Sequence, residues 1–586
     1  MGDFKKESNM ILKKIAYKIE KSNLAYLFTA FFIIGFLIYF ASFFNGFVWD
    51  DEEQILKNAI IQNITNLPYL FTSSTFNTGG AGLSGFYYKP LMPVSFSFIN
   101  FIFGLNPFFY HFFDLIIHFA NVCLLFLFFK KIFDHFKYKF SKTISFFLSL
   151  IFLVHPANVE SVVYISSTQE LLYVFFLLLT LLISFKFLID KKLNWKYLAF
   201  LSFFSLCSLL SKESGIIVIP ILITIAFLIN RSRIKAIIFS SFFVLLFYLL
   251  LRFPIAKTPL FQHSSIIPIA NALLLERLLT VPFELFSYLR LIFFPLNLFV
   301  AQHFVVQSLF DVRFYLTLPF LLIFCVIFLF ISRKFKSKSF LFFSLWLAFS
   351  FFLLLNIYPL DMTVAERWLY GPLIGVLGLT GAIFLKGIEK NIRYLQFFVL
   401  FSLLATVFFS IRSFNRTFNW NSNLSLFSHD INFVPNSFDA QNNLGVALFN
   451  QGNMQKAEEH FKNSIKLSPN WWTPYNNLGA IYQRLGKLKE AKDLYQKSID
   501  KGNYYLAYEN LAQLKAATED PKQVIPFLES SLRTLPNNEV LNKTAAYIYF
   551  KTGNVQQAKL YATRTYQIRQ TQENYLLLQS ILNPKK

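Results

Sequence analysis

Long runs of apolar residues, separated by short polar segments, occupy the first 411 residues of the chain. About 20 apolar residues suffice for one helical crossing of a bilayer, and shorter runs are tolerated inside a bundle. On this basis the pattern predicts eleven spans. They lie near residues 24–44, 108–129, 142–155, 167–189, 196–211, 213–230, 236–251, 313–332, 340–356, 368–386 and 393–411.

Groups of lysine and arginine set the expected orientation of these spans. They lie at 5–21, 130–142, 191–196, 231–235, 333–338 and 386–393, all on one side of the arrangement. The positive-inside rule makes that side cytoplasmic, so residues 1–23 are cytoplasmic and the loop 45–107 lies outside. This orientation of the domain 24–411 requires that the apolar segment 278–300 does not cross. We therefore expect a re-entrant or interfacial helix there.

The composition changes after residue 411, where the apolar runs end. A linker over 412–436 is followed by a period of 33 or 34 residues, with repeats near 438–471, 472–504, 505–538 and 539–572. Small residues recur at one place in each repeat: Leu444-Gly445, Leu478-Gly479, Leu511-Ala512 and Ala545-Ala546. This pattern is typical of tetratricopeptide repeats, so we expect residues 437–586 to form a soluble α-solenoid.

Asparagines also recur at matching positions in these repeats. An asparagine amide suits binding to an extended peptide backbone, so we expect a protein or peptide acceptor to bind the concave face of the solenoid. The alternative is a spacer or dimerisation module in which these asparagines only fill consensus positions. The candidates are Asn442, Asn443, Asn476, Asn477 and Asn510.

Composition agrees with this division of the chain. The 586 residues are 55% hydrophobic and 15% charged, with a mean hydropathy of +0.47, too apolar for a soluble protein of this length. The formal net charge of +23 comes from short basic groups between apolar runs, so we expect no nucleic-acid partner. The predicted fold class is all-α: a polytopic transmembrane helix bundle of about eleven spans, followed by a tetratricopeptide solenoid.

An acidic cluster opens the first outer loop. The sequence NGFVWDDEE at residues 45–53 carries four carboxylates directly after the first span. Such a cluster is costly to place at a membrane surface in so basic and apolar a chain. Taken alone, it is equally consistent with catalysis and with capping of a loop or an interfacial helix.

A second group of polar residues lies on one helix. His111, Asp114, His118 and Asn121 are spaced by three, four and three residues, which places them on one face of the second predicted span. Ionisable groups in a span normally face the bundle interior or a water-filled cavity, which indicates a functional site. Interhelical hydrogen bonding is the alternative.

Further candidates lie on the outer side: Lys89, His155, Glu160, Lys212, Glu366 and Arg367. The cations Lys89, Lys212 and Arg367 share this side with the acidic loop. They would suit a lipid phosphate held beside a carboxylate base. The alternative is that Lys212 with Glu213, and Glu366 with Arg367, are neighbouring ion pairs that only stabilise the bundle.

Taken together, these motifs resemble a known family. FVWDDEEQI, YYKPL, the His-x-x-Asp-x-x-x-His helix, HPANVESV followed by QELL, LLSKESG and AERWLYGP occur in this order before the repeats. The order is similar to that of the bacterial tetratricopeptide membrane glycosyltransferases and of the eukaryotic transmembrane-and-tetratricopeptide O-mannosyltransferases, both of the GT-C superfamily. The chain departs from the bacterial members at Thr168-Gln169-Glu170, where they often have Arg-Lys-Asp, and at Asp114, where they often have Asn.

The resemblance implies a GT-C-like enzyme of the bacterial inner membrane, with the repeats on the periplasmic or exoplasmic side. It implies transfer of a sugar, with mannose as one candidate, from a polyprenyl-phosphate donor to a hydroxyl, with protein Ser/Thr as the expected acceptor. Direct attack would invert the sugar configuration. Asp51 is the first choice for the general base and Asp50 the second, because both match the acidic position of the family's first outer loop. Lys212 and Arg367 are the candidates for the donor phosphate.

No cofactor beyond the lipid-linked sugar is indicated, and a role for a divalent metal is left open. The chain has no Gly-rich phosphate loop and no Asp-x-Asp motif, so nucleotide binding is not expected. Two other functions compete with this hypothesis. One is a non-enzymatic membrane-anchored scaffold for envelope protein assembly, and the other is a polysaccharide polymerase or ligase.

Overall fold

The computed structural model describes residues 2–75, 87–190, 193–259, 266–300, 302–335 and 337–583. Within these ranges the secondary structure is helical and no strand occurs. The chain divides into two compact units, a membrane unit that ends at Val434 and a repeat unit that begins at Pro435. The all-α prediction, with a helix bundle followed by repeats, is confirmed.

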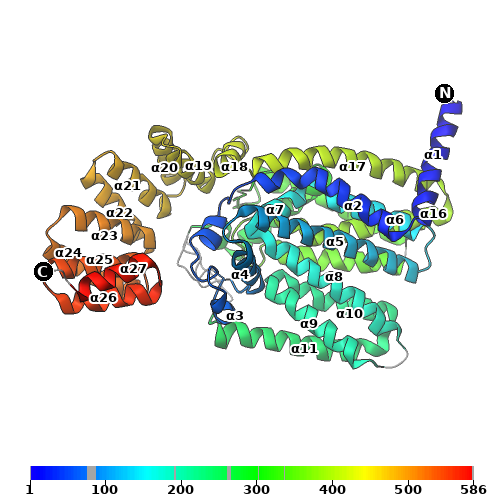
Figure 1. Ribbon diagram of the computed structural model, residues 1–586. Coiled ribbons are helices and arrows are strands. Elements are labelled where there is room, and N and C mark those ends of the chain that lie inside the picture. Colours follow the sequence, from blue (N-terminus) through cyan, green and yellow to red (C-terminus); the bar gives the residue numbers. More distant parts are fainter. Residues whose placement is uncertain are drawn as a thin grey trace. The chain divides into compact units, whose positions relative to one another are not determined.

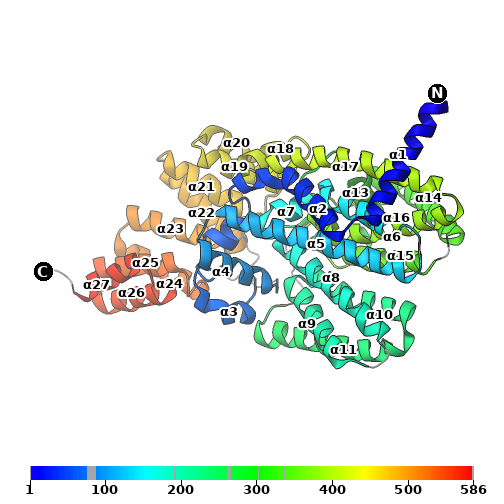
Figure 2. The ribbon, with the colours of Figure 1, turned by 45° about the vertical axis from the view of Figure 1, so that its right-hand side comes forward.

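The helices of the membrane unit are α1 (Gly2–Lys21), α2 (Leu24–Tyr39), α3 (Leu67–Thr72), α4 (Leu91–Phe103), α5 (Pro107–His135), α6 (Ser141–Val154), α7 (Val159–Val163), α8 (Thr168–Ile189), α9 (Trp195–Ser211), α10 (Val218–Ile229), α11 (Ile234–Leu250), α12 (Pro268–Asn271), α13 (Leu274–Phe293), α14 (Val312–Lys334), α15 (Lys338–Leu354), α16 (Tyr370–Lys390), α17 (Arg393–Asn419) and α18 (Asn423–Asp430). Helix α5 packs against α2, α6 and α8 near the middle of the bundle. Figures 1 and 2 show α9, α10 and α11 grouped beside α8 at one edge.

Seven helical segments are long and apolar enough to cross a bilayer: Leu24–Phe44, Pro107–His135, Ile165–Ile189, Arg231–Ile255, Val312–Lys334, Glu366–Lys390 and Arg393–Asn419. The pair Ser141–Val154 and Pro156–Val163, bent by 53°, passes the same test together and gives an eighth segment if it forms one broken span. The chain is therefore a multi-pass membrane protein. The other three predicted spans coincide with shorter apolar helices, Trp195–Ser211, Glu213–Ile229 and Lys338–Leu354, and their crossing stays a prediction.

Small residues bring helices together inside this bundle. On α16, a Cβ added at Gly371 would overlap the Tyr173 hydroxyl of α8, and one added at Gly378 would overlap the Phe343 ring of α15. Close backbone approach at glycine is typical of packing between membrane helices. Helix α16 is thereby fixed in the bundle just after the turn that carries Arg367.

Two segments differ in character from the spans around them. Helix α13 carries Glu276, Arg277, Glu284 and Arg290 and is not among the candidate spans, and its expected interfacial position stays a prediction. The predicted linker 412–436 is largely helical, because α17 continues to Asn419 and α18 follows. The end of α17 is buried against the membrane unit at Ser413, so packing extends this helix beyond its apolar run.

The repeat unit consists of paired helices. The pairs are α19 (Phe438–Asn450) with α20 (Met454–Leu467), α21 (Thr473–Arg484) with α22 (Leu488–Gly502), α23 (Tyr505–Thr518) with α24 (Pro521–Thr534), and α25 (Glu539–Lys551) with α26 (Val555–Ile568), followed by α27 (Gln572–Leu582). Gly445 and Gly479 allow the close approach of Phe461 and Tyr495 from the second helix of each pair. Four helix pairs with a recurring small-to-aromatic contact are what the repeat pattern predicts.

Candidate active site

The acidic loop after α2 is fastened to the end of α17. The Gly46 N–H donates to the Asn421 carbonyl (3.2 Å), and the Trp49 N–H donates to Asn423 Oδ1 (2.7 Å). Asn423 Nδ2 in turn donates to Glu52 Oε1 (3.2 Å). Trp49 has a φ of 60°, so the chain reverses there. The two bonds of Asn423 join segments that are 374 and 371 residues apart in the chain, and the acidic loop forms a corner there.

The two aspartates of this corner have different surroundings. Asp51 is 1% exposed; its Oδ2 accepts from the Val48 N–H (3.0 Å), and its Oδ1 accepts from the N–H (2.8 Å) and the hydroxyl (2.5 Å) of Ser166. Asp50 is half-buried, and its Oδ2 accepts from the phenol of Tyr164 (2.9 Å). No other donor among the described residues reaches the Asp50 carboxylate. Three hydrogen bonds therefore fix Asp51 in the loop, whereas Asp50 Oδ1 accepts no hydrogen bond from the described residues.

Burial shifts the pKa of both aspartates toward neutral pH. Desolvation raises the pKa of Asp50 to about 6 and that of Asp51 to about 7, although hydrogen bonds from Tyr164 and Ser166 oppose the shift. The Arg367 guanidinium also favours the Asp50 carboxylate, whereas Asp361 and Glu53 disfavour it. A carboxylate with a pKa of about 6 can accept a proton at neutral pH better than an ordinary aspartate can.

Arg367 and Glu160 form a buried ion pair beside this corner. Arg367 Nη1 donates to Glu160 Oε1 (2.6 Å), and the Arg367 N–H donates to Glu160 Oε2 (3.0 Å). The guanidinium lies 5.6 Å from the centroid of the Trp49 ring. Glu160 thus orients Arg367 toward the acidic loop.

The other candidate residues form ion pairs with more distant partners, not with their neighbours in the sequence. Lys212 pairs with Glu170, and Glu213 pairs with Arg252 (3.4 Å). Glu366 pairs with Arg416 of α17 (3.4 Å). The alternative that adjacent residues pair, as Lys212 with Glu213 or Glu366 with Arg367, is wrong, because consecutive side chains diverge along the turns that carry them.

Lys89 differs from the other cations. It is 8% exposed, and its ammonium lies 4.1 Å from the centroid of the Tyr87 ring. Across the described ranges of the chain it forms no ion pair. Burial lowers its pKa, an effect opposed by the charges of Glu213 and Asp361. A buried ammonium with no carboxylate partner is suited to an anionic ligand.

Asp361 is a member of the site that sequence reasoning missed. The Tyr87 phenol hydrogen-bonds to it, and its charge acts on Asp50, Lys89 and Arg367. Asp361 precedes the AERWLYGP motif in the loop after α15. Only the fold brings that loop to the first one, and no local spacing in the sequence signals it.

Two of the three predicted histidines form hydrogen bonds inside the bundle. His118 Nδ1 lies 2.8 Å from the Tyr370 hydroxyl and Nε2 lies 3.3 Å from the Leu153 carbonyl. His155 Nε2 lies 2.9 Å from the Ile292 carbonyl, and His111 is buried. The neighbouring polar positions of α5 behave alike: Thr168 donates to Asp114 Oδ1 (2.6 Å), and Asn121 donates to the Leu171 carbonyl (2.9 Å). Hydrogen bonds between helices therefore account for most of the polar residues on this face of α5. Binding of the sugar donor by the histidines stays a prediction.

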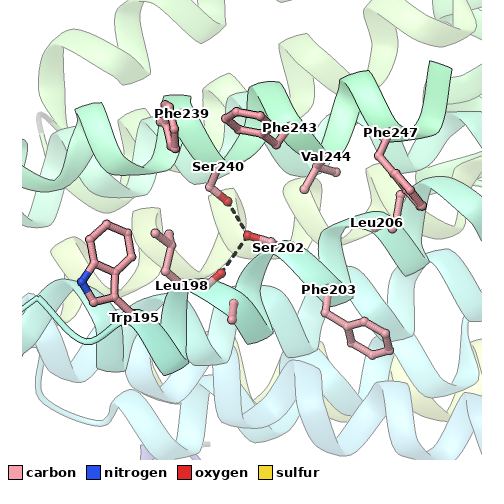
Figure 3. Close-up of a pocket in the computed structure, with 11 residues that line it drawn as sticks. Trp195, Leu198, Ser202, Phe203, Leu206, Phe239, Ser240, Phe243, Val244 and Phe247 are labelled. Carbon is pink, nitrogen blue, oxygen red and sulfur yellow. Dashed lines mark hydrogen bonds between the residues drawn. The ribbon is translucent and has the colours of Figure 1, made fainter. Parts of the chain in front are cut away.

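An apolar groove of about 500 Å³ lies between α9 and α11. Figure 3 shows aromatic and aliphatic side chains on both walls and the Ser202–Ser240 hydroxyl pair (2.6 Å) between them. The groove extends from Trp195 to Leu206 and Phe247. At that end Leu206 packs on the cluster that contains Tyr88, the residue before Lys89.

In the repeat unit, the predicted asparagines bond to one another. Asn477 Nδ2 donates to Asn442 Oδ1 (2.9 Å), and Asn510 Nδ2 donates to Asn476 Oδ1 (2.9 Å). Asn442 also donates to Asn443 Oδ1 (3.1 Å). These bonds link successive repeats. They also use some of the amide groups that were expected to bind a peptide. Peptide binding by these residues stays a prediction.

The described part of the chain contains no group of three or more His, Cys, Asp or Glu side chains that could hold a metal ion.

Comparison with known proteins follows the same division of the chain. The tetratricopeptide repeat family matches residues 436–502. Protein O-mannosyl-transferase F38B6.6 of Caenorhabditis elegans is 25% identical over 450 residues, which cover 74% of this chain and 61% of that protein. Protein O-mannosyl-transferase TMTC3 of Homo sapiens is 27% identical over 466 residues, which cover 72% of this chain and 49% of that protein.

This chain thus spans about half to three-fifths of the length of these relatives. Among solved structures, the tetratricopeptide protein YrrB is 16% identical with a TM-score of 0.24, covering 27% of this chain and 82% of YrrB. That score is too low to support any argument. The chain is therefore homologous, over most of its length, to proteins named protein O-mannosyl-transferases, and it ends in a tetratricopeptide domain.

Proposed function

We propose that this protein is an inverting GT-C-type glycosyltransferase that uses Asp50 as its general base. The observation that carries the proposal is the Asp50 carboxylate, which keeps Oδ1 free of donors from the described residues beside the buried cation Arg367. Asp51, the first choice from sequence, has its carboxylate occupied by three donors, which suits an anchor rather than a base.

The reaction needs little from the protein beyond these groups. An acceptor hydroxyl attacks the anomeric carbon from the face opposite the phosphate, and its proton passes to Asp50. The bond between the anomeric carbon and the phosphate oxygen breaks, and the polyprenyl phosphate leaves with an added negative charge. Buried cations stabilise that charge where it develops. Lys89 is our candidate for this role because it has no carboxylate partner in the described chain, with Lys212 and Arg367 assisting.

The groove between α9 and α11 suits the hydrocarbon tail of such a donor. Its walls are apolar, and its Leu206 end borders the cluster around Tyr88, next to Lys89. A lipid in the groove would therefore place its phosphate near Lys89. A photoreactive polyprenyl phosphate should label α9 and α11 more than the exposed face of α14, which includes Leu322 and Phe330. Equal labelling would show only general lipid contact.

The acceptor and the side of the membrane follow from the relatives and from the charge pattern. The relatives are named for O-mannosylation of proteins, so we propose mannose as the sugar and protein Ser/Thr as the acceptor. The positive-inside rule favours an exoplasmic position for the Asp50 loop and the repeats. The repeats then serve to bind the acceptor protein.

The proposal is tested with the full chain in nanodiscs. Radiolabelled polyprenyl-phosphate mannose is supplied with Ser/Thr peptides, and both transfer and the configuration of the product are measured. Transfer with inversion that is lost in Asp50→Asn, with donor binding kept, supports the proposal. A parent chain that neither binds the donor nor transfers sugar would instead support the scaffold function.

A further inference from the structure

Three aromatic rings form a column directly behind Asp50. The Tyr164 ring lies between those of Trp49 (centroids 5.2 Å apart, planes at 18°) and Trp420 (5.1 Å, 23°). Trp49 belongs to the acidic loop, Tyr164 to the turn between α7 and α8, and Trp420 to the end of α17. The column thus joins three segments that are far apart in the sequence.

Guanidinium groups close both ends of the column. Arg367 lies 5.6 Å from the Trp49 ring centroid, and Arg416 lies 5.8 Å from that of Trp420. Arg416 is fully buried and paired with Glu366 (3.4 Å) and Asp430 (3.7 Å). Buried cations over aromatic faces are favourable, so each end of the column is held by an ion pair and a cation–π contact.

Trp420 contributes through its ring rather than its N–H group. It is 1% exposed, and its Nε1 donates to no acceptor among the described residues. A buried tryptophan normally finds an acceptor for this group. The contact that Trp420 makes with the column is the stack of its ring on Tyr164.

The column makes one polar contact with the loop. Its middle member, Tyr164, donates to Asp50 Oδ2 (2.9 Å). We propose that Tyr164 is a positioning residue for Asp50, and that Trp420 and Arg416 position Tyr164. The last span thereby sets the geometry of the base. This inference rests on the proposed function, because it assigns the hydrogen bond a role in sugar transfer.

The hydrogen bond also affects the titration of Asp50. The other charged groups that act on Asp50 are Arg367, Asp361, Glu53 and Asp51. Tyr164 stabilises the carboxylate, so its loss should raise the pKa of Asp50 by about one unit. The base acts in its deprotonated form. The pH below which the rate of sugar transfer falls should therefore move to a higher value.

Four variants separate positioning from packing. Tyr164→Phe keeps the ring and removes the hydroxyl, whereas Trp420→Leu keeps the hydroxyl and removes the stack. Trp420→Phe should restore part of the function, because a smaller ring can still stack. Trp346→Phe is the matched control, since Trp346 is equally buried, but its Nε1 bonds to the Gly371 carbonyl (3.1 Å) elsewhere in the bundle.

Two readouts are measured on the full chain in nanodiscs. One is the pH dependence of sugar transfer, and the other is the midpoint of the protonated-carboxyl infrared band that Asp50→Asn abolishes. We expect the midpoint and the acid limb to rise in Tyr164→Phe and Trp420→Leu, to return toward the parent values in Trp420→Phe, and to stay unchanged in Trp346→Phe.

Unchanged midpoints and rates in Tyr164→Phe, or in a well-folded Trp420→Leu, would overturn the inference and leave the column a packing feature. If Trp420→Leu does not fold, Tyr164→Phe and Trp420→Phe still decide the question. If the parent chain transfers no sugar but the infrared midpoint still rises in Tyr164→Phe and Trp420→Leu, the proposed function is refuted and the positioning of Asp50 is supported.

Discussion

The ion pair between Arg367 and Glu160 gives a stability prediction that can be worked from the structure. Glu160 is 0% exposed and accepts two hydrogen bonds, from Arg367 Nη1 (2.6 Å) and from the Arg367 N–H (3.0 Å). In Glu160→Gln the arginine stays buried without its charge partner. Removing one member of a buried pair costs about 3–5 kcal/mol, so we expect a loss of this size.

A second ion pair serves as the comparison. Lys386 and Glu389 lie 2.7 Å apart, and their side chains are 32% and 39% exposed. Exposed pairs contribute less than about 1 kcal/mol, so Glu389→Gln should have a small effect. Unfolding in mixed micelles with increasing SDS, followed by tryptophan fluorescence, measures both variants.

The double variant separates loss of the pair from general damage. In Glu160→Gln with Arg367→Met, no unpaired charge remains, so the double variant should be less destabilised than the sum of the two single variants. Additive effects, or equal losses in Glu160→Gln and Glu389→Gln, would refute the reasoning that burial makes the Arg367 pair strong.

Three further predictions concern catalysis and packing. Burial raises the pKa of Asp50 to about 6, so transfer should fall about tenfold per pH unit below that value as the base becomes protonated; a rate that stays flat to pH 5 would contradict this. Lys89→Met should weaken donor binding at least about tenfold, with Lys57→Met, a change at an exposed lysine, as the control; equal donor affinity in both would exclude Lys89 from the phosphate site. Gly378→Ala should lower the melting temperature, because its Cβ would overlap the Phe343 ring, and an unchanged temperature would show that α15 can move away.

Much of the architecture could be predicted from the sequence because it depends on local periodicity. Apolar runs of helical length mark the spans, and the period of 33 or 34 residues marks the repeats. The helix over 412–419 was missed because its buried face is set by contacts with distant segments, such as the bond from Ser413 to the Val154 carbonyl (2.7 Å). Such contacts, for example from Asn45 to the Thr417 carbonyl (3.3 Å), are invisible to a local pattern.

Most residues of the candidate site could be proposed from the sequence, but the ion pairs that they form could not. Sequence reasoning identified Asp50, Asp51, Glu160 and Arg367, yet it offered pairings between neighbours and missed Asp361. The reason is that ion pairs here join segments far apart in the sequence, as Glu160 and Arg367 do across 207 residues. Likewise, the difference between Asp50 and Asp51 depends on which side chain meets Ser166, and no spacing encodes that contact.

The most direct test of the central claim compares the first-turnover rates of Asp50→Asn and Asp51→Asn, each saturated with the lipid-linked donor. General-base catalysis contributes about 10²–10⁴-fold, so Asp50→Asn should lose that factor with donor affinity kept. Asp51→Asn should lose less rate and more stability, because it removes an anchor of the loop. A first-turnover rate that is normal in Asp50→Asn and abolished in a folded Asp51→Asn would contradict the account and assign the base to Asp51.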